Sequence, residues 1–235
     1  MTYVISDLHG YSLEKFKALL RKAKFSDKDF LYILGDVIDR NGDGGVEMLC
    51  WLLEQPNVQL ILGNHEAMLL SCAFVFDEIT ENSIEGMTEE KIGLLNNYML
   101  NGGDVTLKAL QKLKKNSPDT VLDILDYLRD APLYEAITAG ENDFLLVHSG
   151  IDHFNKNKKL SQYSADDFLW AWPSINDEYF EDILTVFGHT PTMSFGEAYT
   201  GKILKTKTWI DIDVGTGFGQ DPVLLRLDDF KEFQL

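Results

Sequence analysis

The stretch Gly-Asp-Val-Ile-Asp-Arg at residues 35–40 is the part of this sequence from which the fold is inferred. It follows the apolar run 30–34, and a short apolar run closed by glycine is typical of a buried strand that ends in a tight turn. The turn carries Asp36, Asp39 and Arg40. Charged groups at the end of a buried strand are costly unless something pairs with them. We therefore expect other polar segments of the chain to meet this turn.

Four such segments also place polar side chains beside glycine, directly after an apolar run. They are Asp7-Leu8-His9-Gly10, Gly63-Asn64-His65-Glu66, His148-Ser149-Gly150 and Gly188-His189-Thr190. Up to residue 76 the chain repeats a strand, a polar segment and a helix three times. This alternation predicts βαβ units with a parallel sheet and right-handed crossovers. Open α/β sheets bind ligands at the carboxyl ends of their strands, so the polar segments are expected to meet at one edge.

The expected elements of this first part can be placed from their apolar periodicity. Strands are predicted at 3–5, 30–34 and 58–62, and helices at 13–23, about 42–55 and 66–76. Residues 77–90 are rich in Asp and Glu and without a clear period. We interpret them as a solvated loop, with a lid over the site as the alternative. Residues 91–130 carry helical leucine stripes, so we expect one domain over 1–235 with a helical insertion at about 77–130.

The part after Pro132 is expected to be mainly β. A hairpin is predicted at 133–147 and a further strand at 183–187. Two more strands, at 208–212 and 222–227, are expected to finish a second, mixed sheet.

The composition limits the partners that we expect. The 235-residue chain carries 38 Asp and Glu against 21 Lys and Arg, a formal net charge of -17. Such a surface repels nucleic acid and anionic membranes, so we expect neither as a partner. No apolar run approaches the ~18 residues of a membrane helix and no basic leader is apparent, so we expect a cytoplasmic protein. The two cysteines are expected to be free thiols.

The histidines are concentrated in the polar segments. The chain has five, and four of them directly follow apolar runs: His9, His65, His148 and His189, with His153 as the exception. Imidazole together with carboxylate and amide oxygens is the ligand set of Zn, Mn or Fe rather than of Mg or Ca. This pattern predicts a metal site.

The spacing of the polar residues allows two metal ions. Asp7 and His9 are two residues apart, which at a strand end points both side chains to one side, and Asp36 can reach the same place. The remaining donors can complete a second site: Asn64, His148 and His189. A carboxylate shared by two cations is the usual basis of a dinuclear hydrolytic centre, which polarises a phosphoryl oxygen and activates a bridging water.

Taken together, these segments resemble the phosphoprotein phosphatase family of calcineurin-like metallophosphoesterases, in particular its small bacterial and bacteriophage branch, to which the lambda phage phosphatase belongs. The motifs of that family are, in order, Gly-Asp-x-His-Gly, Gly-Asp-x-x-Asp-Arg-Gly, Gly-Asn-His-Glu, a later His, and Gly-His-Thr. The matching segments here are 6–10, 35–41, 63–66, His148 and 188–191. Their order and spacing agree over nearly the whole chain.

The resemblance implies a role for each matching side chain. It implies that the first metal is bound by Asp7, His9 and Asp36. It implies that the second metal is bound by Asp36, Asn64, His148 and His189. His65 is then the general acid that protonates the leaving oxygen, and Asp39 orients it. Arg40 grips the phosphate, which a guanidinium can do bidentately, and Asn64 is also expected at the substrate.

The resemblance also implies the fold and the reaction. The expected fold is an α/β sandwich of two central mixed β-sheets flanked by helices. The expected enzyme is a dinuclear metal-dependent phosphoesterase that hydrolyses phosphomonoesters by direct attack of a metal-bound water. Mn²⁺ is the expected cation, with Fe or Zn as alternatives. The first interpretation of the substrate is a phosphorylated protein, which makes the chain a serine/threonine protein phosphatase, or a small phosphoester.

Two alternatives stay open. One is a hydrolase of dinucleotides such as diadenosine tetraphosphate, although related bacterial hydrolases of that kind usually lack the Asp-Arg pair and have Asp where Glu66 stands. The other is a metal-bound, non-catalytic binding module, against which the intact His65, Asp39 and Arg40 argue.

One departure from the family concerns the phosphate. Relatives commonly place a second phosphate-binding arginine near a tryptophan, between the last two metal-binding histidines. This chain has Trp170-Ala171-Trp172-Pro173 in that region and no arginine from 130 to 225. We predict that Lys158, from the connection 152–181, stands in for the arginine.

Overall fold

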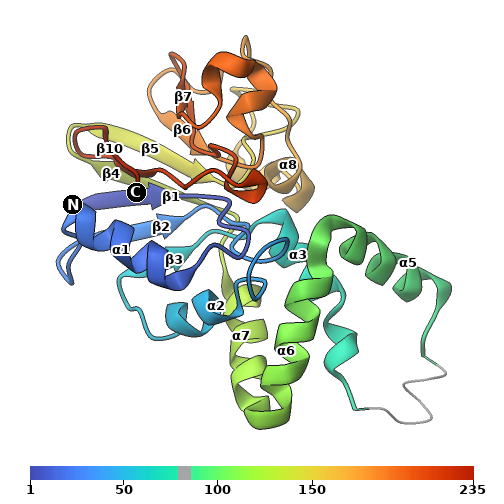
Figure 1. Cartoon of the computed structure of the whole chain (residues 1–235). Coiled ribbons are helices and arrows are strands. Elements are labelled where there is room, and N and C mark those ends of the chain that lie inside the picture. The colour runs from blue at the N-terminus through green and yellow to red at the C-terminus, as the bar shows by residue number, and fades with distance from the viewer. Residues whose placement is uncertain (79–85) are drawn as a thin grey trace.

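The computed structural model of the chain describes residues 1–78 and 86–235. Within these residues, two five-stranded sheets pack face to face, and helices cover the outer face of the first sheet (Figure 1). The strands are β1 (Thr2–Ile5), β2 (Phe30–Ile33), β3 (Val58–Leu60), β4 (Tyr134–Ala139), β5 (Asn142–Val147), β6 (Leu184–Phe187), β7 (Leu204–Lys205), β8 (Trp209–Asp211), β9 (Leu224–Arg226) and β10 (Lys231–Phe233). The α-helices are α1 (Leu13–Ala23), α2 (Val46–Leu52), α3 (Asn64–Ser71), α5 (Glu89–Tyr98), α6 (Asp104–Asn116), α7 (Pro118–Asp130) and α8 (Ala165–Leu169).

The first sheet has the strand order β10-β9-β1-β2-β3. Strands β1, β2 and β3 are parallel, as the strand-helix alternation predicted. The prediction for the strand at 222–227 was wrong, because β9 pairs antiparallel with β1 in this sheet instead of joining the second. Leu224 packs toward the helices and Leu225 toward the second sheet, and both are fully buried. A strand buried on both faces has no polar alternation that would tell which sheet it joins.

The second sheet has the order β4-β5-β6-β8-β7. The predicted hairpin is present as the antiparallel pair β4 and β5. Strands β5, β6 and β8 are parallel to one another. Both sheets are therefore mixed, which confirms the expected sandwich.

Three apolar layers hold these elements together. A central cluster between the sheets includes Val4, Phe144 and Val186. A larger cluster lies between the first sheet and its helices, and a third lies on the outer face of the second sheet. At roughly 25 cal/mol per Å² of apolar surface removed from water, burial on both faces is the main stabilising contribution to such a sandwich.

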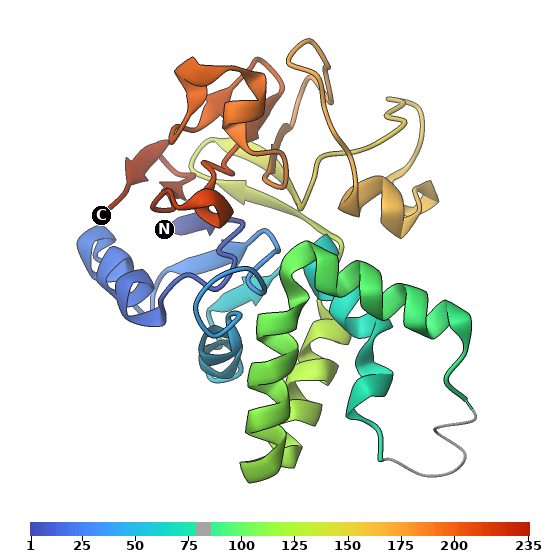
Figure 2. The same ribbon diagram turned by 45° about the vertical axis from the view of Figure 1, so that its right-hand side comes forward.

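Helices α5, α6 and α7 form a helical arm beside the first sheet. Helices α6 and α7 lie side by side, and α5 extends sideways from the end at which α6 begins, next to α3 (Figure 2). A kink at Gly102, whose φ is 94°, separates α5 from α6. The expectation of a loop or lid at 77–90 falls largely on residues 79–85, which lie outside the described residues.

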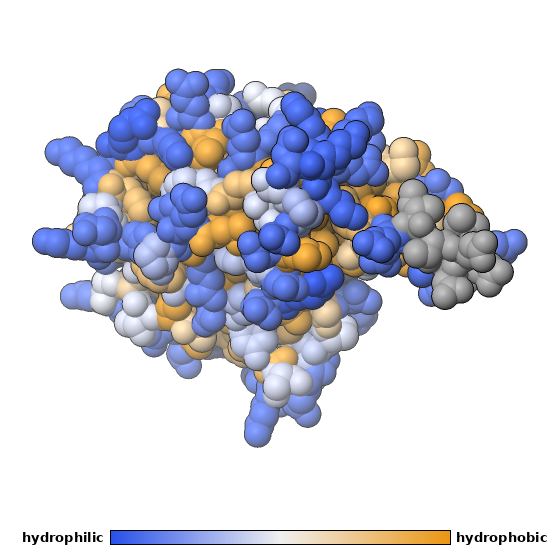
Figure 3. Space-filling model, turned by 90° about the horizontal axis from the view of Figure 1, so that it is seen from below, coloured by the Kyte–Doolittle hydropathy of each residue, from blue (hydrophilic) through white to orange (hydrophobic). Residues whose placement is uncertain are grey.

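The surface is largely hydrophilic on the face that Figure 3 shows. Seen from below, hydrophilic side chains cover most of the face, with smaller apolar areas between them (Figure 3). Among the described residues, no helix combines the length and the apolar character that crossing a bilayer requires.

Candidate active site

The polar segments of the sequence meet where parallel strands of both sheets end. In the first sheet, β1 is followed by Asp7 and His9, and β2 by Asp36. In the second sheet, β5 is followed directly by His148, and His189 comes two residues after β6. The side chains therefore converge on one edge of the sandwich, as the sequence predicted.

Many of these residues have an unusual backbone conformation. Nine non-glycine residues of the described chain have positive φ, and six of them belong to the predicted site: Asp7, His9, Asp36, Asp39, Arg40 and His189. A left-handed conformation costs an ordinary residue about 1 kcal/mol or more and persists only where the surroundings enforce it. The clustering of this strain at one place is itself an indication of a functional site.

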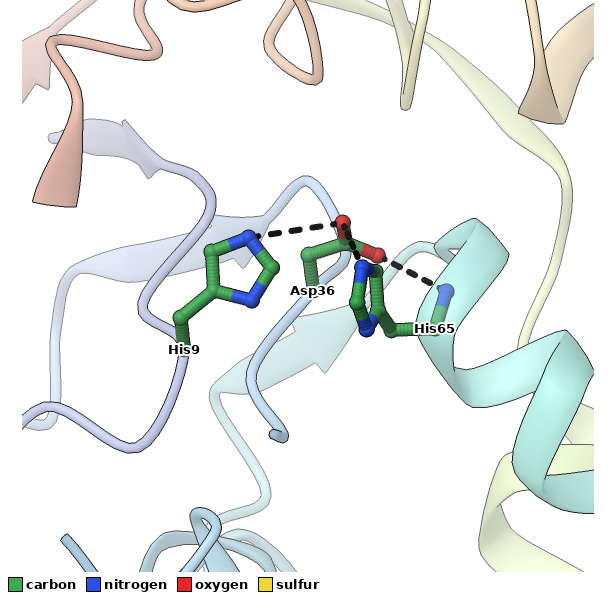
Figure 4. A group of neighbouring side chains, drawn as sticks. All are labelled: His9, Asp36 and His65. Atoms are coloured by element: carbon green, nitrogen blue, oxygen red, sulfur yellow. Dashed lines mark hydrogen bonds and ion pairs between the residues drawn. The ribbon is translucent and has the colours of Figure 1, made fainter. Parts of the chain in front are cut away.

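Asp36 lies at the centre of the site. Its Oδ2 is 3.7 Å from His9 Nε2 and 3.8 Å from His65 Nε2, and both imidazoles point at the carboxylate (Figure 4). Its Oδ1 is 3.5 Å from Nε2 of His148. The two oxygens of one buried carboxylate therefore face two separate groups of donors, one including His9 and the other including His148 and His189.

Backbone carbonyls determine which nitrogen of two histidines carries the proton. His148 Nδ1 lies 2.7 Å from the oxygen of Leu34, and His9 Nδ1 lies 3.1 Å from the oxygen of Ile38. A carbonyl oxygen only accepts, so each Nδ1 must donate. The lone pair of each Nε2 is then directed at Asp36, which is the orientation that a metal ligand requires.

Asn64 adds a further oxygen to the second group. Its Oδ1 is 2.9 Å from His148 Nε2 and 3.1 Å from His189 Nδ1. In this orientation several lone pairs face one another, and a cation is what stabilises such an arrangement. A 180° rotation of the amide would let its NH₂ group donate to the same atoms and to Asp36.

The pKa shifts of the site residues also favour the binding of cations. Burial lowers the pKa of His9 to about 3, and burial together with His148 lowers that of His189 to about 3. These imidazoles are neutral at pH 7 and free to bind metal. Burial and the neighbouring Asp213 raise the pKa of Asp7 well above its usual value. Buried carboxylates that repel one another are relieved by a positive charge, so the residues present fit a dinuclear metal site.

Asp7 lies at the edge of the two groups rather than within them. Its Oδ2 accepts a 2.9 Å hydrogen bond from the backbone N–H of His189. This bond joins the polar segment of the first sheet to that of the second. The role of Asp7 as a ligand stays a prediction.

His65 and Asp39 form the pair that was predicted to act as the general acid. His65 Nδ1 lies 2.6 Å from Oδ2 of Asp39, and both side chains are buried. Burial alone would lower the pKa of His65, but the carboxylates of Asp36 and Asp39 outweigh it and raise the pKa. The protonated imidazole is thereby favoured, and its Nε2 faces the site.

Arg40 follows Asp39 in the same turn. Its Nη2 is 3.3 Å from Nε2 of His65, and its guanidinium is exposed toward the cavity. The backbone N–H of Arg40 donates to the oxygen of Gly102 in the helical arm. The kink at Gly102 thus supports the residue that is predicted to bind the phosphate.

Three supporting residues were not assigned a role from the sequence. Glu66 accepts hydrogen bonds from four backbone N–H groups, those of Asp36, Val37, Ile38 and Gly63. Tyr98 and Thr106 both donate to Oδ1 of Asp39, at 2.7 and 2.5 Å. The position of Glu66 three residues after Gly63 was a usable capping signal. Tyr98 and Thr106 carry no local signal, because their partner is distant in sequence.

Lys158 is not brought to the cavity. Its Nζ lies 3.7 Å from the ring centre of Tyr163 and 3.9 Å from Asp167. A role at the substrate would require the side chain to leave both partners, so that role stays a prediction. His153, the histidine set apart in the sequence, lies exposed and 3.0 Å from Asp167.

The site lines a cavity of about 250 Å³. Its walls combine the polar residues above with aromatic ones: His9, Asp36, Arg40, Asn64, His65, His189, Trp170, Trp172 and Phe218 are among them. The cavity therefore brings together the imidazole that is predicted to act as the acid, several predicted metal ligands and the guanidinium of Arg40.

Comparison with known proteins gives a family and a set of relatives. A family model described as calcineurin-like phosphoesterase matches residues 2–213. The symmetrical bis(5'-nucleosyl)-tetraphosphatase of Actinobacillus succinogenes is 39% identical over 152 residues, which cover 64% of this chain and 44% of that protein. The enzyme of the same name from Buchnera aphidicola is 36% identical over 100 residues, 42% of this chain and 35% of that protein. The chain thus matches less than half the length of these curated relatives.

Solved structures agree on the fold. A crystal structure of a candidate diadenosine tetraphosphatase has a TM-score of 0.60 at 17% identity, covering all of this chain (100%) and 92% of that one. A serine/threonine phosphatase from Saccharomyces cerevisiae has a TM-score of 0.51 at 16% identity, covering 95% and 71%. At such identities the likeness concerns the fold alone.

Proposed function

This chain belongs to the calcineurin-like phosphoesterase family, and we propose that it is a metal-dependent hydrolase that cleaves dinucleoside polyphosphates. The observation that carries the hydrolytic part is the shared carboxylate of Asp36, which faces His9 and His65 with one oxygen and His148 with the other, while His65 pairs with Asp39. The names of the curated relatives support the dinucleotide substrate.

The curated relatives and the sequence motifs favour different substrates. The motifs alone placed a serine/threonine protein phosphatase first and a dinucleotide hydrolase second. The curated relatives favour the second, and no comparison above with an informative level of identity favours the first. The Asp39–Arg40 pair and Glu66 keep the phosphomonoesterase as the second candidate.

The residues of the chain suit such a reaction. Two bound divalent cations would polarise a phosphoryl oxygen and lower the pKa of the attacking water. Asp36, His9, Asn64, His148 and His189 would hold them, with Asp7 as the further predicted ligand. Mn²⁺, Fe or Zn suits this mixture of imidazole and oxygen donors.

The other side chains bind the substrate and move protons. Arg40 neutralises a non-bridging phosphoryl oxygen beside the metals. The Nε2–H of His65 protonates the bridging oxygen as it leaves, while Asp39 holds the imidazole in position. In a dinucleoside tetraphosphate, water would bond to one central phosphorus, and the bridging oxygen would depart on the other half. The products are then two nucleoside diphosphates.

One substrate comparison tests the proposal. The purified chain, with Mn²⁺, is given diadenosine tetraphosphate, p-nitrophenyl phosphate and a phosphoserine peptide, and the products are separated by anion-exchange chromatography. We expect the tetraphosphate to have the highest kcat/KM and ADP to be the sole nucleotide product. A preference for the phosphoserine peptide would support the protein phosphatase instead. Hydrolysis of none of the three would support a non-catalytic binding module.

A further inference from the structure

Exposed aromatic side chains are confined to one place on this protein. The chain contains 14 Phe, 9 Tyr and 4 Trp. Within residues 1–78 and 86–235, only Trp170, Trp172 and Phe218 among them are exposed, with 41%, 64% and 61% of their surface accessible. All three line the cavity that holds the candidate metal centre. Leaving such large apolar surfaces in water costs free energy, so their gathering at the site calls for a ligand.

The three rings lie on two sides of the centre. The ring centres of Trp170 and Trp172 are 6.1 and 5.4 Å from that of His189, in the second group of metal ligands. Phe218 lies on the other side, where the guanidinium of Arg40 is 5.4 Å from its ring centre. A ligand whose phosphates occupy the centre would therefore meet an aromatic ring at either end.

The tryptophan pair is held in place by the buried residue between its members. Ala171 is buried, and its N–H donates a 2.9 Å hydrogen bond to the hydroxyl of Ser149, next to His148. That hydroxyl in turn donates to the oxygen of Phe168. The exposed rings on either side are thus presented by an anchored backbone rather than by a loose loop.

The loop that carries Phe218 is also anchored at the site. Gly217 packs so closely that a Cβ atom there would lie 2.7 Å from both His9 and Arg40. Only glycine fits at this approach. The close approach of Gly217 to His9 and Arg40 therefore places the neighbouring ring of Phe218 at the edge of the cavity.

The cavity has few positive side chains, which bears on what these rings bind. Arg40 is the one Lys or Arg side chain among the described residues that line it, and Lys158 is engaged elsewhere. A polyphosphate would be gripped by the metals and one guanidinium. Much of its affinity would then have to come from parts of the ligand other than the phosphates.

We propose that Trp172 and Phe218, assisted by Trp170, form the base-binding rim of the site. Each side of the rim stacks one nucleobase of a dinucleoside polyphosphate, whose central phosphates lie over the metal ligands. Every nucleobase has an aromatic face, so stacking of this kind binds nucleotides with little regard to the base. The inference rests on the proposed function and names the residues that select a nucleotide over a simple phosphoester.

The first test separates binding of the base from binding of the phosphate. Isothermal titration with ADP and with inorganic pyrophosphate, in the presence of Mn²⁺, is carried out on the wild type, Trp172→Ala, Phe218→Ala and the conservative Trp172→Phe. Because ADP carries one base and the rim has two sides, we expect the wild type to bind two ADP molecules. Each alanine variant should bind one of the two about tenfold more weakly, the effect of one lost stacking contact, with pyrophosphate binding unchanged. Trp172→Phe should recover most of the loss. Equal losses of affinity for ADP and for pyrophosphate, or no loss of affinity for ADP, would overturn the proposal of a base-binding rim.

The second test uses turnover and a matched control. For diadenosine tetraphosphate, KM should rise about tenfold in each alanine variant while kcat changes little. Ile175→Ala removes an exposed apolar side chain from the same segment, outside the cavity, and should behave as the wild type. If the wild type cleaves the tetraphosphate and the alanine variants have an unchanged KM, the base-binding rim is overturned but the proposed function is not. A KM increase for a phosphopeptide only would overturn it in favour of a peptide-binding surface.

The two proposals can fail separately. A wild type that does not cleave the tetraphosphate, yet binds ADP through Trp172 and Phe218, would remove the proposed reaction and keep a nucleotide site.

Discussion

Tyr98 donates a 2.7 Å hydrogen bond to Oδ1 of Asp39, 59 residues earlier in the chain. Thr106 donates to the same oxygen, while the other oxygen of Asp39 lies 2.6 Å from His65. The helical arm is therefore tied to the predicted acid pair. It holds the carboxylate that is predicted to orient the general acid, and its kink at Gly102 holds the backbone of Arg40.

Replacement of Tyr98 by Phe should reduce kcat with little change in KM. Asp39 would keep one donor of the two and would hold His65 less firmly, so we expect a loss of about tenfold, smaller than that for removing the acid itself. Tyr127→Phe removes a phenol hydroxyl from the neighbouring helix α7 and is the control. If the Tyr98 variant raises KM and leaves kcat intact, Tyr98 acts on substrate binding and not on the acid.

The roles of His65 and Asn64 should separate in metal analysis. His65→Ala should lower kcat by on the order of 10²–10⁴ while both metals stay bound, since it removes a general acid. Asn64→Ala should lower the metal content, because it removes a ligand oxygen. Inductively coupled plasma mass spectrometry of the dialysed variants measures this directly.

The positions of the ligand atoms also allow the opposite assignment, in which His65 is a metal ligand. His65 Nε2, His9 and Asp36 offer ligand atoms within 4.8 Å of one another. Loss of metal from His65→Ala together with full metal content in Asn64→Ala would exchange the two assignments.

Chelation should abolish activity, and Mn²⁺ should restore it better than Mg²⁺. Three of the expected ligands are imidazoles, which suit Mn, Fe or Zn, whereas Mg²⁺ prefers oxygens and keeps its waters. The measurement is kcat after treatment with EDTA, removal of the chelator and titration with each cation. Full recovery in Mg²⁺ alone would contradict the ligand set.

Glu66→Gln should destabilise the protein. Two backbone N–H groups lie within 3.4 Å of each carboxylate oxygen, and glutamine can accept at only one of its two ends. The unpaired donors should cost about 1–3 kcal/mol in the free energy of unfolding, measured by urea denaturation. Glu141→Gln, in the exposed hairpin turn, is the matched control and should lie near the wild type. Equal stability of the two variants would show that the Glu66 contacts are replaceable.

Much of the site could be predicted from local sequence. Each ligand lies in a short segment after an apolar strand, and strand ends are recognisable because strand, turn and helix have different periodicities. The order of the motifs then indicated the family, and parallel strands necessarily bring their carboxyl ends to one edge. His9, Asp36, His65, His148 and His189 are therefore found together, as their spacing predicted.

Prediction from the sequence was less successful where the contacting residue lies far away in the chain, or where residue type was the only signal. The strand at 222–227 was assigned to the wrong sheet, because a strand buried on both faces carries no mark of its neighbour. Lys158 was chosen for its charge and its position between two histidines; its Nζ lies over Tyr163, and its role at the substrate stays a prediction. The sequence also does not distinguish an exposed tryptophan from a buried one.

The sequence by itself determined which residues are candidates for the chemistry, because metal ligands and an acid pair require particular side chains at particular distances from strand ends. Only the tertiary structure decided how those residues are held and what surrounds them. The link from Tyr98 to Asp39, the two-sided arrangement around Asp36 and the gathering of three exposed aromatic rings at one cavity all join segments far apart in the chain. Such contacts arise from the packing of the sheets and the helical arm, and local periodicity contains no information about them.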